Sequence, residues 1–192
     1  MNSILIAGIG GAGSDLAADF HGSLNIPAIA INTDKKSLAQ SALARRLLIG
    51  PIVCNGAAAG VPARGRLAAE ESIAQINVIL NDVKTLILVA GLGGGTGTGV
   101  ATFMASLARQ RSINVIAAVT LPSQLEHQRR QPALDALREL ESLGVTVFVH
   151  DHAATLGEAA GADQPLSHLL QASSRALTLA VRDHLGLVLA DV

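Results

Sequence analysis

The sequence predicts an α/β domain with a doubly wound, mostly parallel sheet and helices on both faces, of the Rossmann-like type. Short apolar runs rich in Ile and Val alternate with longer segments of helical period, as is typical of α/β folds. Most of these runs are nearly unbroken, which indicates strands buried on both faces of a parallel sheet. Trp and Tyr are absent and Phe occurs 3 times, so Ala, Leu, Ile and Val must build the core.

The expected elements follow from these two periods. The strands are expected at Ser3–Ile9, Ile26–Asn32, Arg45–Ile49, Thr85–Ala90, Asn114–Thr120 and Val145–His150. The helices are expected at Gly11–Phe20, Arg64–Asn81, Thr98–Arg111, Pro132–Leu143 and Pro165–Leu187. Pro132 fits the first turn of its helix, and Gly144 lies just past the end of the same helix. Asn55–Gly65, rich in Gly and Ala, is expected to be the longest irregular loop.

Length and composition bound the class of protein. A chain of 192 residues is expected to form a single domain, residues 1–192, and 49% hydrophobic residues exclude a disordered chain. Lys and Arg number 14 against 15 Asp and Glu, and aromatic residues make up 2%, so nucleic acid is not an expected partner. A single cysteine, Cys54, excludes an intramolecular disulfide. With no apolar window long enough for a transmembrane segment and no signal peptide, the chain is expected in the cytoplasm.

A first glycine loop follows the first expected strand. Gly8, Gly10 and Gly13 match the G-x-G-x-x-G pattern before a helix. Asp34 follows the second strand, at the ~20-residue spacing of a dinucleotide fingerprint. Glycines let the backbone approach a pyrophosphate, and the helix N-terminus stabilises its charge. The alternative for this loop is a tight strand-to-helix turn without a ligand.

A second loop follows the strand expected at Thr85–Ala90. Gly93–Gly99 contains five glycines and two threonines, a composition that is entropically unfavourable for a merely structural turn. Its backbone N–H groups, its threonine hydroxyls and the start of the next helix would together hold a polyphosphate. The loop has no lysine, so it is not a P-loop. An oxidoreductase that binds NAD(P) through Gly8–Gly13 and Asp34 remains an alternative, but it does not explain this second loop.

Several segments, in their order and spacing, resemble FtsZ, the bacterial relative of tubulin. They are Gly10–Gly13, Asn32–Asp34, Ala68–Glu71, Gly93–Gly99 and Thr120–Pro122. The resemblance extends from Ile4 to Val181 and implies a GTP- or GDP-binding protein of the FtsZ/tubulin superfamily. Nucleotide-controlled assembly, in a cytoskeletal or membrane-associated role, is the implied function. A ligand-free interaction module is the other alternative.

The resemblance also implies roles for individual residues. The phosphates would be held by glycine-loop residues at matching positions, namely Gly10, Gly11, Gly13, Gly94, Gly95, Thr96 and Gly97. Glu126 and Arg130 match the ribose-contacting pair, and Gly56–Gly60 matches a loop near the γ-phosphate with an altered motif. His150-Asp151-His152 lacks a third ligand at a set spacing, so no protein-held metal site is predicted. A Mg²⁺ would be held mostly by the phosphates.

The departures from the family gather where the base is expected. Asp15 and Asp151 stand where the family has Asn, Gln171 stands where it has a stacking aromatic, and Arg175 stands where it has the guanine-reading acid. A guanidinium only donates hydrogen bonds, so Arg175 cannot accept from guanine in the same way. Asp15 and Asp151 are acceptors and are carried with Arg175 as base-side candidates. Guanine stays the expected base.

The C-terminal region departs from the family as well. The family continues into a loop with catalytic acids and a second domain, whereas this sequence ends at Val192, so the second domain is expected to be absent. No catalytic residue is assigned. Asp191 is the one candidate, and hydrolysis is expected to need another subunit or a partner. Asp34 and Glu70 are the acids expected on the phosphate side.

A surface for a partner is expected on the last helix. Apolar residues recur along Pro165–Leu187, namely Leu166, Leu169, Leu170, Leu177, Ala180, Val181 and Leu185. In the family this helix lies between two domains, so one side is expected to be uncovered within this chain. An apolar stripe of that length exceeds what monomers usually expose. A homo-oligomer or a protein partner is therefore expected to cover it.

Overall fold

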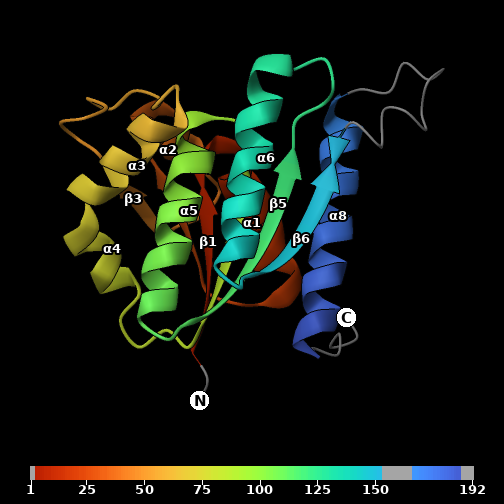
Figure 1. Cartoon of the computed structure of the whole chain (residues 1–192). Helices are drawn as coiled ribbons and strands as arrows, with labels where there is room; N and C mark the ends of the chain where they lie inside the picture. Colours follow the sequence, from red (N-terminus) through yellow and green to blue (C-terminus); the bar gives the residue numbers. More distant parts are fainter. Residues whose placement is uncertain (1–2, 153–165, 187–192) are drawn as a thin grey trace.

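The computed structural model describes residues 3–152 and 166–186, with side chains described from 171 in the second range. Within these residues the chain forms one parallel sheet of six strands in the order β3-β2-β1-β4-β5-β6 (Figure 1). The strands are β1 Ile4–Ile9, β2 Ala28–Asn32, β3 Arg46–Leu48, β4 Thr85–Gly91, β5 Asn114–Leu121 and β6 Thr146–Asp151. The predicted doubly wound fold is confirmed, and its strand order is the one typical of Rossmann folds.

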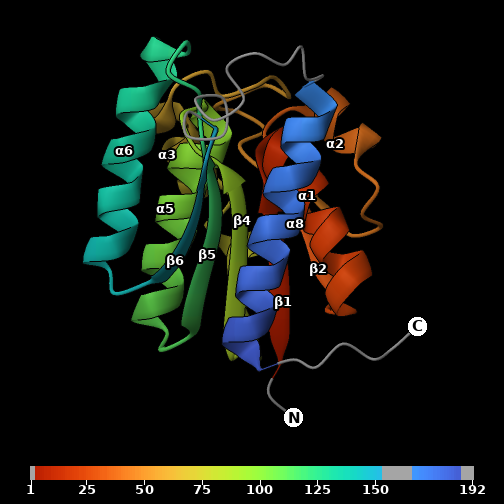
Figure 2. The ribbon, with the colours of Figure 1, turned by 90° about the vertical axis from the view of Figure 1, so that its right-hand side faces the viewer.

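Helices cover both faces of this sheet, as the two views at right angles show (Figures 1 and 2). One face carries α1 Gly10–Leu24, α2 Lys35–Gln40 and α8 Leu166–Leu185. The other face carries α3 Pro62–Glu71, α4 Ile73–Ile79, α5 Gly95–Gln110 and α6 His127–Ser142. Each layer buries its own apolar cluster against the sheet.

Strand β4 shows why the apolar runs predicted a parallel sheet. Successive side chains of a strand point to opposite faces, and here both faces are covered by helices. Leu86 and Leu88 therefore pack on the α5 side, while Ile87 and Val89 pack on the α1 side, and all four are fully buried. The same burial extends through β1 and β5, its neighbours in the sheet.

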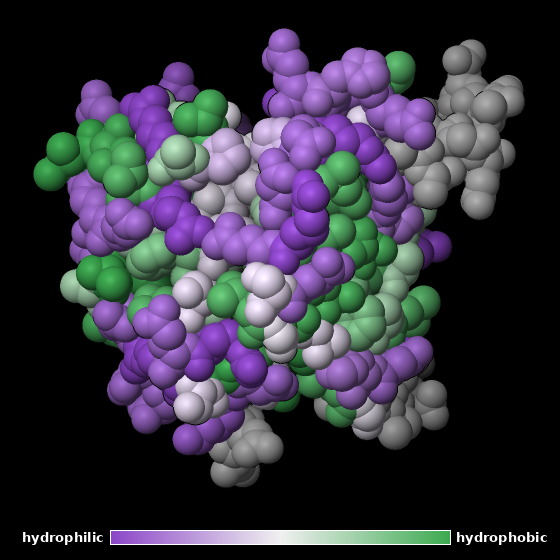
Figure 3. Space-filling view, in the orientation of Figure 1, coloured by the Kyte–Doolittle hydropathy of each residue, from purple (hydrophilic) through white to green (hydrophobic). Residues whose placement is uncertain are grey.

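The edge strand β6 is less covered than the strands inside the sheet. Its side chains are half-buried or exposed along its whole length, and Val149 is 41% exposed. Figure 3 shows hydrophobic surface beside the hydrophilic side chains of α6, over the β5–β6 edge of the sheet. This edge therefore contributes less to the core than β1, β4 and β5 do.

The helix predicted at Arg64–Asn81 is in fact two helices that meet at Ser72. The Ser72 hydroxyl accepts a hydrogen bond from the Gly50 N–H at 2.9 Å, and the Glu71 carboxylate accepts from the N–H groups of Ile52 and Val53 at 2.8 and 2.9 Å. These contacts tie the junction of the two helices to the loop after β3, and the regular helix is interrupted there. The single-helix prediction was wrong because long-range partners of polar side chains are not visible in a local period.

Two further predictions about helices were wrong. Helix α2 was not expected, and it begins because the Asp34 carboxylate caps it by accepting from the N–H groups of Lys36 and Ser37 at 2.8 and 3.0 Å. Pro132 lies inside α6 and not in its first turn, because α6 begins at His127.

The apolar stripe expected on α8 faces the sheet where its side chains are described. Leu177 and Val181 are buried in the core and Leu185 packs partly against it, so the expected uncovered side is wrong for these residues. The outward face carries Arg175, Asp183 and Leu179, of which Leu179 is 48% exposed. The side chains of Leu166, Leu169 and Leu170, like Pro165 and Leu187, lie outside the described residues. In the described part of the chain, none of the helices has the length and apolar content needed to cross a membrane.

Candidate functional site

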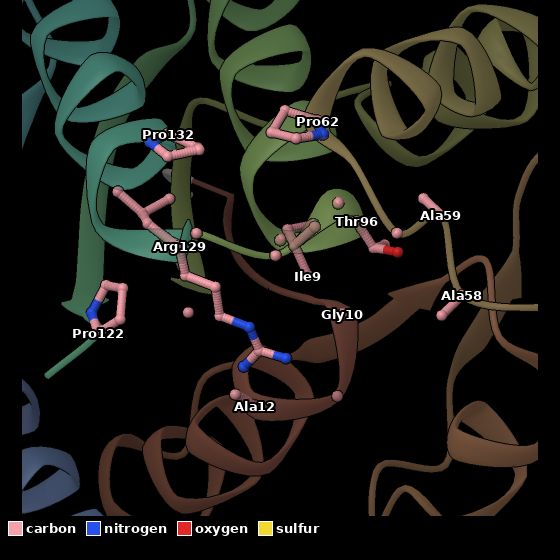
Figure 4. A pocket seen from close by; sticks show the side chains of 18 of the residues that line it. Ile9, Gly10, Ala12, Ala58, Ala59, Pro62, Thr96, Pro122, Arg129 and Pro132 are labelled. Carbon is pink, nitrogen blue, oxygen red and sulfur yellow. The ribbon is translucent and has the colours of Figure 1, made fainter. Parts of the chain in front are cut away.

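A large cleft lies at the carboxyl ends of β1 and β4, where the strand order reverses. The chain leaves β1 into α1 on one face and leaves β4 into α5 on the other, so the two connections diverge and open a crevice between them. The cleft has a volume of about 590 Å³ and is lined by the starts of both helices, by the Ala58–Pro62 segment and by the start of α6 (Figure 4). Ligands of doubly wound sheets bind at this kind of position.

The first glycine loop turns directly from β1 into α1. Gly10 has φ +74°, a conformation that side chains rarely adopt, and it begins the helix. Gly13 allows close packing, because a Cβ there would lie 2.4 Å from the Val89 carbonyl oxygen of β4. Among the described residues, no side chain caps the N-terminus of α1. The first N–H groups of this helix are therefore left without a helical or a side-chain acceptor.

The second glycine loop turns from β4 into α5. Gly94 is the N-cap residue, and no described side chain caps this helix either. The two threonine hydroxyls are occupied within the protein: Thr98 Oγ1 accepts from the Gly93 N–H at 2.7 Å, and Thr96 Oγ1 lies 2.7 Å from Thr33 Oγ1. These contacts fix the loop, and the expectation that the hydroxyls help to hold a polyphosphate stays a prediction, because a hydroxyl that accepts one hydrogen bond can still donate one. The backbone N–H groups at the start of α5 remain as donors.

The glycines of the second loop differ in what surrounds them. A Cβ on Gly95 would lie 2.6 Å from the Gly60 nitrogen, and one on Gly97 would lie 2.2 Å from the Gly91 carbonyl oxygen. A Cβ on Gly94 would meet no atom within 4 Å. Packing within the protein thus explains Gly95 and Gly97, while Gly94 borders open space in the cleft.

Two helix N-termini thus line the same cleft without side-chain caps. Aligned peptide dipoles place a partial positive charge at each N-terminus, and unpaired N–H groups donate in the same direction. Such a pair of termini is suited to an anion that carries several negative charges, such as a polyphosphate. Of the glycine-loop residues predicted to hold phosphates, Gly10, Gly11, Gly94, Gly95, Thr96 and Gly97 line the cleft, and Gly13 lies beneath it against β4.

Asp34 lies at the far side of this cleft and is used by the fold. Its Oδ1 caps α2, as described above, while the residue lines the cleft. Glu70 is exposed on α3 and does not line the cleft. Of the two acids expected on the phosphate side, Asp34 therefore lines the cleft and Glu70 does not.

The two predicted ribose residues are separated by the structure. Glu126 lines the cleft at the start of α6. Arg130 does not line it: its guanidinium donates to both carboxylate oxygens of Asp151 at 2.7 and 2.6 Å and to the Pro122 carbonyl at 2.6 Å. The hydrogen bond that Arg130 donates to Asp151 raises the pKa of Arg130 above its usual value, against the effect of burial and together with the charge of Asp151. Arg129, the preceding residue of α6, lines the cleft.

The predicted base-side residues do not gather in one place. Asp15 is exposed on α1 outside the cleft lining, and partial burial followed by the Asp19 charge raises the pKa of its carboxyl. Asp151 is held by Arg130. Arg175 and Gln171 line a second pocket of about 510 Å³ between α1 and α8. Asp191 lies outside the described residues.

His152, at the end of β6, lines the cleft and was not assigned a role there from the sequence. Its Nε2 lies 3.2 Å from Ser173 Oγ, and its ring meets that of His150 edge-on with centroids 5.7 Å apart. The H-x-H pattern after a strand was the available signal. In the described part of the chain, no three His, Cys, Asp or Glu side chains are grouped to hold a metal ion.

We expect the stability of the protein to fall on mild acidification because of this histidine pair. Burial lowers the pKa of His150 and of His152, and the charge of His150 lowers the pKa of His152 further. The charge of Asp151 opposes both shifts, and the charge of Glu126 opposes the shift of His152. The unfolded chain then binds more protons than the folded one below a pH of about 6.5. The contribution of these neutral histidines to the free energy of unfolding is therefore fully present above that pH and is lost as the pH falls below it.

Urea denaturation at a series of pH values measures this slope. His152→Asn should flatten it, while the exposed His127→Asn on α6 should leave it unchanged. Equal slopes in the wild-type protein and in His152→Asn would show that His152 does not carry the effect.

Comparison with known proteins agrees with this site. The family model described as the Tubulin/FtsZ family, GTPase domain, matches residues 3–157. The cell division protein FtsZ of Helicobacter pylori is 35% identical over 151 residues, which are 76% of this chain and 39% of that protein. FtsZ of Methanothermobacter thermautotrophicus is 39% identical over 150 residues, with the same shares of each chain. The chain thus spans well under half the length of these curated relatives.

Solved structures show the same relationship. An empty FtsZ dimer from M. jannaschii matches 100% of this chain and 56% of its own, with a TM-score of 0.85 and 29% identity. CetZ2 from Haloferax volcanii, in a GTPγS-bound protofilament, matches 93% of this chain and 57% of its own, with a TM-score of 0.79 and 25% identity. By its sequence and its fold, this chain belongs to the tubulin/FtsZ family and matches the GTPase domain of that family.

Proposed function

We propose that this chain binds GTP or GDP in the cleft between α1 and α5, as the nucleotide-binding domain of an FtsZ-like protein. The observation that carries the proposal is the pair of uncapped helix N-termini, from Gly10 and from Gly95, that line one cleft. Their N–H groups would bind the α-, β- and γ-phosphates. The open space at Gly94 supports the same position for the phosphates, because an added side chain would enter it.

The sugar and the base are assigned from the side of the cleft formed by α6 and β6. Glu126 is proposed for the ribose, since its carboxylate lines the cleft and accepts hydrogen bonds from hydroxyl groups. Guanine is proposed as the base from family membership. Asp15, Asp151 and Arg175 stay the base-side candidates from the sequence, although the cleft lining contains none of the three. A Mg²⁺ ion, if bound with the nucleotide, would be held mostly by phosphate oxygens.

Nucleotide-controlled assembly is the proposed role of this binding. It is supported by the relatives, of which one is an FtsZ dimer and another a GTPγS-bound protofilament. An NAD(P)-dependent oxidoreductase is disfavoured, because it would not use the second uncapped helix N-terminus, at α5. A ligand-free interaction module is disfavoured by the same pair of uncapped helices.

Competition titration tests the proposed ligand. Fluorescently labelled GTP should bind the purified protein and be displaced by unlabelled GTP and GDP, but not by ATP or NAD. Binding of NADH that is displaced by NAD and not by GTP would contradict the proposal and favour the oxidoreductase.

We expect the protein by itself to hydrolyse GTP slowly, at a rate of ~10⁻⁴ s⁻¹, as an unassisted GTPase does. Among the described residues, the carboxylates that line the cleft are Asp34, which caps α2, and Glu126, which pairs with Arg129 at 3.1 Å. With Asp34 used as a helix cap and Glu126 proposed for the ribose, neither is proposed to orient a water molecule for attack on the γ-phosphate. Phosphate release should therefore be slow in dilute protein and should rise with concentration if a neighbouring subunit supplies the missing acid.

Phosphate release in excess GTP, measured over a range of protein concentrations, checks this expectation. Rapid release that is independent of concentration and survives Asp191→Ala would contradict it. Such a result would place a catalytic acid inside this domain at another position.

A further inference from the structure

Two consecutive arginines, Arg129 and Arg130, lie in the first turn of α6, and their side chains make different contacts. Neighbouring residues of an α-helix point about 100° apart, so Arg129 and Arg130 leave the helix in different directions. Arg130 is 24% exposed and is directed at Asp151 and the Pro122 carbonyl, through three hydrogen bonds. A bidentate guanidinium–carboxylate pair is among the stronger polar contacts of a protein. Arg130 therefore links the β5–α6 connection to the end of β6.

Arg129 begins beside the second glycine loop. A Cβ on Gly93 would lie 2.7 Å from the Arg129 carbonyl oxygen and 3.0 Å from its Cβ, so the backbones of the two segments touch. From this point the guanidinium extends across the cleft toward Gly10 and Ala12 of the first glycine loop (Figure 4). The side chain of Arg129 thus spans the space between the two glycine loops.

The contact that holds Arg129 in this structure is easily exchanged. Arg129 Nη1 donates to Glu126 Oε2 at 3.1 Å, and the two side chains are 65% and 41% exposed. An exposed ion pair of this kind contributes little to stability, so the guanidinium can leave Glu126 for a more highly charged anion.

The charge of the cleft gives Arg129 a specific partner. Among the described residues that line the cleft, Arg129 is the one lysine or arginine, and the glycine loops supply backbone N–H groups alone. A nucleoside di- or triphosphate brings several negative charges to this space. We propose that Arg129, and not its neighbour Arg130, is the cationic side chain that binds the nucleotide phosphates. Arg130 is a positioning residue that holds the start of α6.

This inference rests on the proposed function and is tested with Arg129→Gln in the full chain. GDP binding is measured by calorimetry at low and at high salt. Loss of a hydrogen bond to a charged group should weaken binding by about tenfold or more. The difference in GDP affinity between Arg129→Gln and the wild-type protein should be smaller at high salt, because salt screens a partly exposed charge interaction. Arg129→Lys should keep part of the affinity, since it keeps the charge.

Arg138→Gln is the matched control on the same helix. Arg138 is also 65% exposed and also pairs with an acid three residues away, Asp135, but it does not line the cleft. Its GDP affinity should equal that of the wild-type protein. Wild-type affinity in Arg129→Gln would overturn the inference and leave the proposed function standing. A loss that is independent of salt would assign Arg129 to an uncharged contact and overturn it too. A folded wild-type protein that binds no GDP would overturn both.

Discussion

A valine at Gly94 is expected to weaken GDP and GTP binding by at least about 100-fold while leaving the protein folded. Gly94 has φ −89° and ψ 168°, which any residue adopts, and a Cβ there meets no protein atom within 4 Å. The valine methyl groups would instead occupy cleft space beside the first N–H groups of α5, where the phosphates are proposed to bind. The change at an N-cap position should cost about 1 kcal/mol of stability or less.

Calorimetric titration with GDP measures the effect, and urea denaturation without nucleotide verifies the fold. Gly22→Val is the matched control, because a Cβ at Gly22 also meets no atom within 4 Å but lies on the exposed side of α1. It should bind GDP as the wild-type protein does. Gly95→Val is less informative, since its Cβ would strike the backbone nitrogens of Gly60 and Val61 at 2.6 and 2.7 Å. Undiminished binding by Gly94→Val would show that the phosphates lie elsewhere.

An alanine at Gly13 is expected to reduce the free energy of unfolding by about 3 kcal/mol or more. Its Cβ would lie 2.4 Å from the Val89 carbonyl oxygen and 3.0 Å from the Ala90 Cα, both of them backbone atoms of the central strand β4. A backbone atom cannot rotate away as a flexible side chain can. Helix α1 would therefore have to move off the sheet, and its N-terminus would move with it.

Gly22→Ala, in the same helix, provides the opposite expectation. It places its methyl group in open space, and replacing a helical glycine by alanine should stabilise the protein by about 0.5–1 kcal/mol. Urea denaturation of both variants without nucleotide measures the difference, because bound ligand would raise the apparent stability. If Gly13→Ala were as stable as Gly22→Ala, the close packing of α1 on β4 would be wrong.

The sheet was largely predictable from the sequence, because its strands are buried on both faces. β4 was expected at Thr85–Ala90 and is found at Thr85–Gly91, and β5 was expected at Asn114–Thr120 and is found at Asn114–Leu121. A continuous apolar run between glycines has few other stable uses, so its boundaries are well defined. The glycine loops followed from the same rule, since both come directly after such a strand.

What could not be predicted depends on polar side chains with partners distant in sequence or on the phase of a helix. Ser72, where α3 ends, accepts a hydrogen bond from the Gly50 N–H, and no local sequence pattern predicts that contact. At the start of α6, the rotation of the helix about its axis decides which of Arg129 and Arg130 faces the cleft. In this rotation Arg130 pairs with Asp151 of another element. The family pattern pointed to Arg130 because it aligns positions and does not contain this pair.

The most direct measurement of the central proposal is the identity of the nucleotide that the protein retains. The purified chain is incubated with an equimolar mixture of GDP, ADP and NAD, freed of unbound ligand, denatured, and the released compounds are separated by chromatography. The two uncapped helices at the glycine loops and the family membership predict GDP in the released fraction. Release of NAD, or of no nucleotide from a folded protein, would contradict the proposal that this cleft binds a guanine nucleotide.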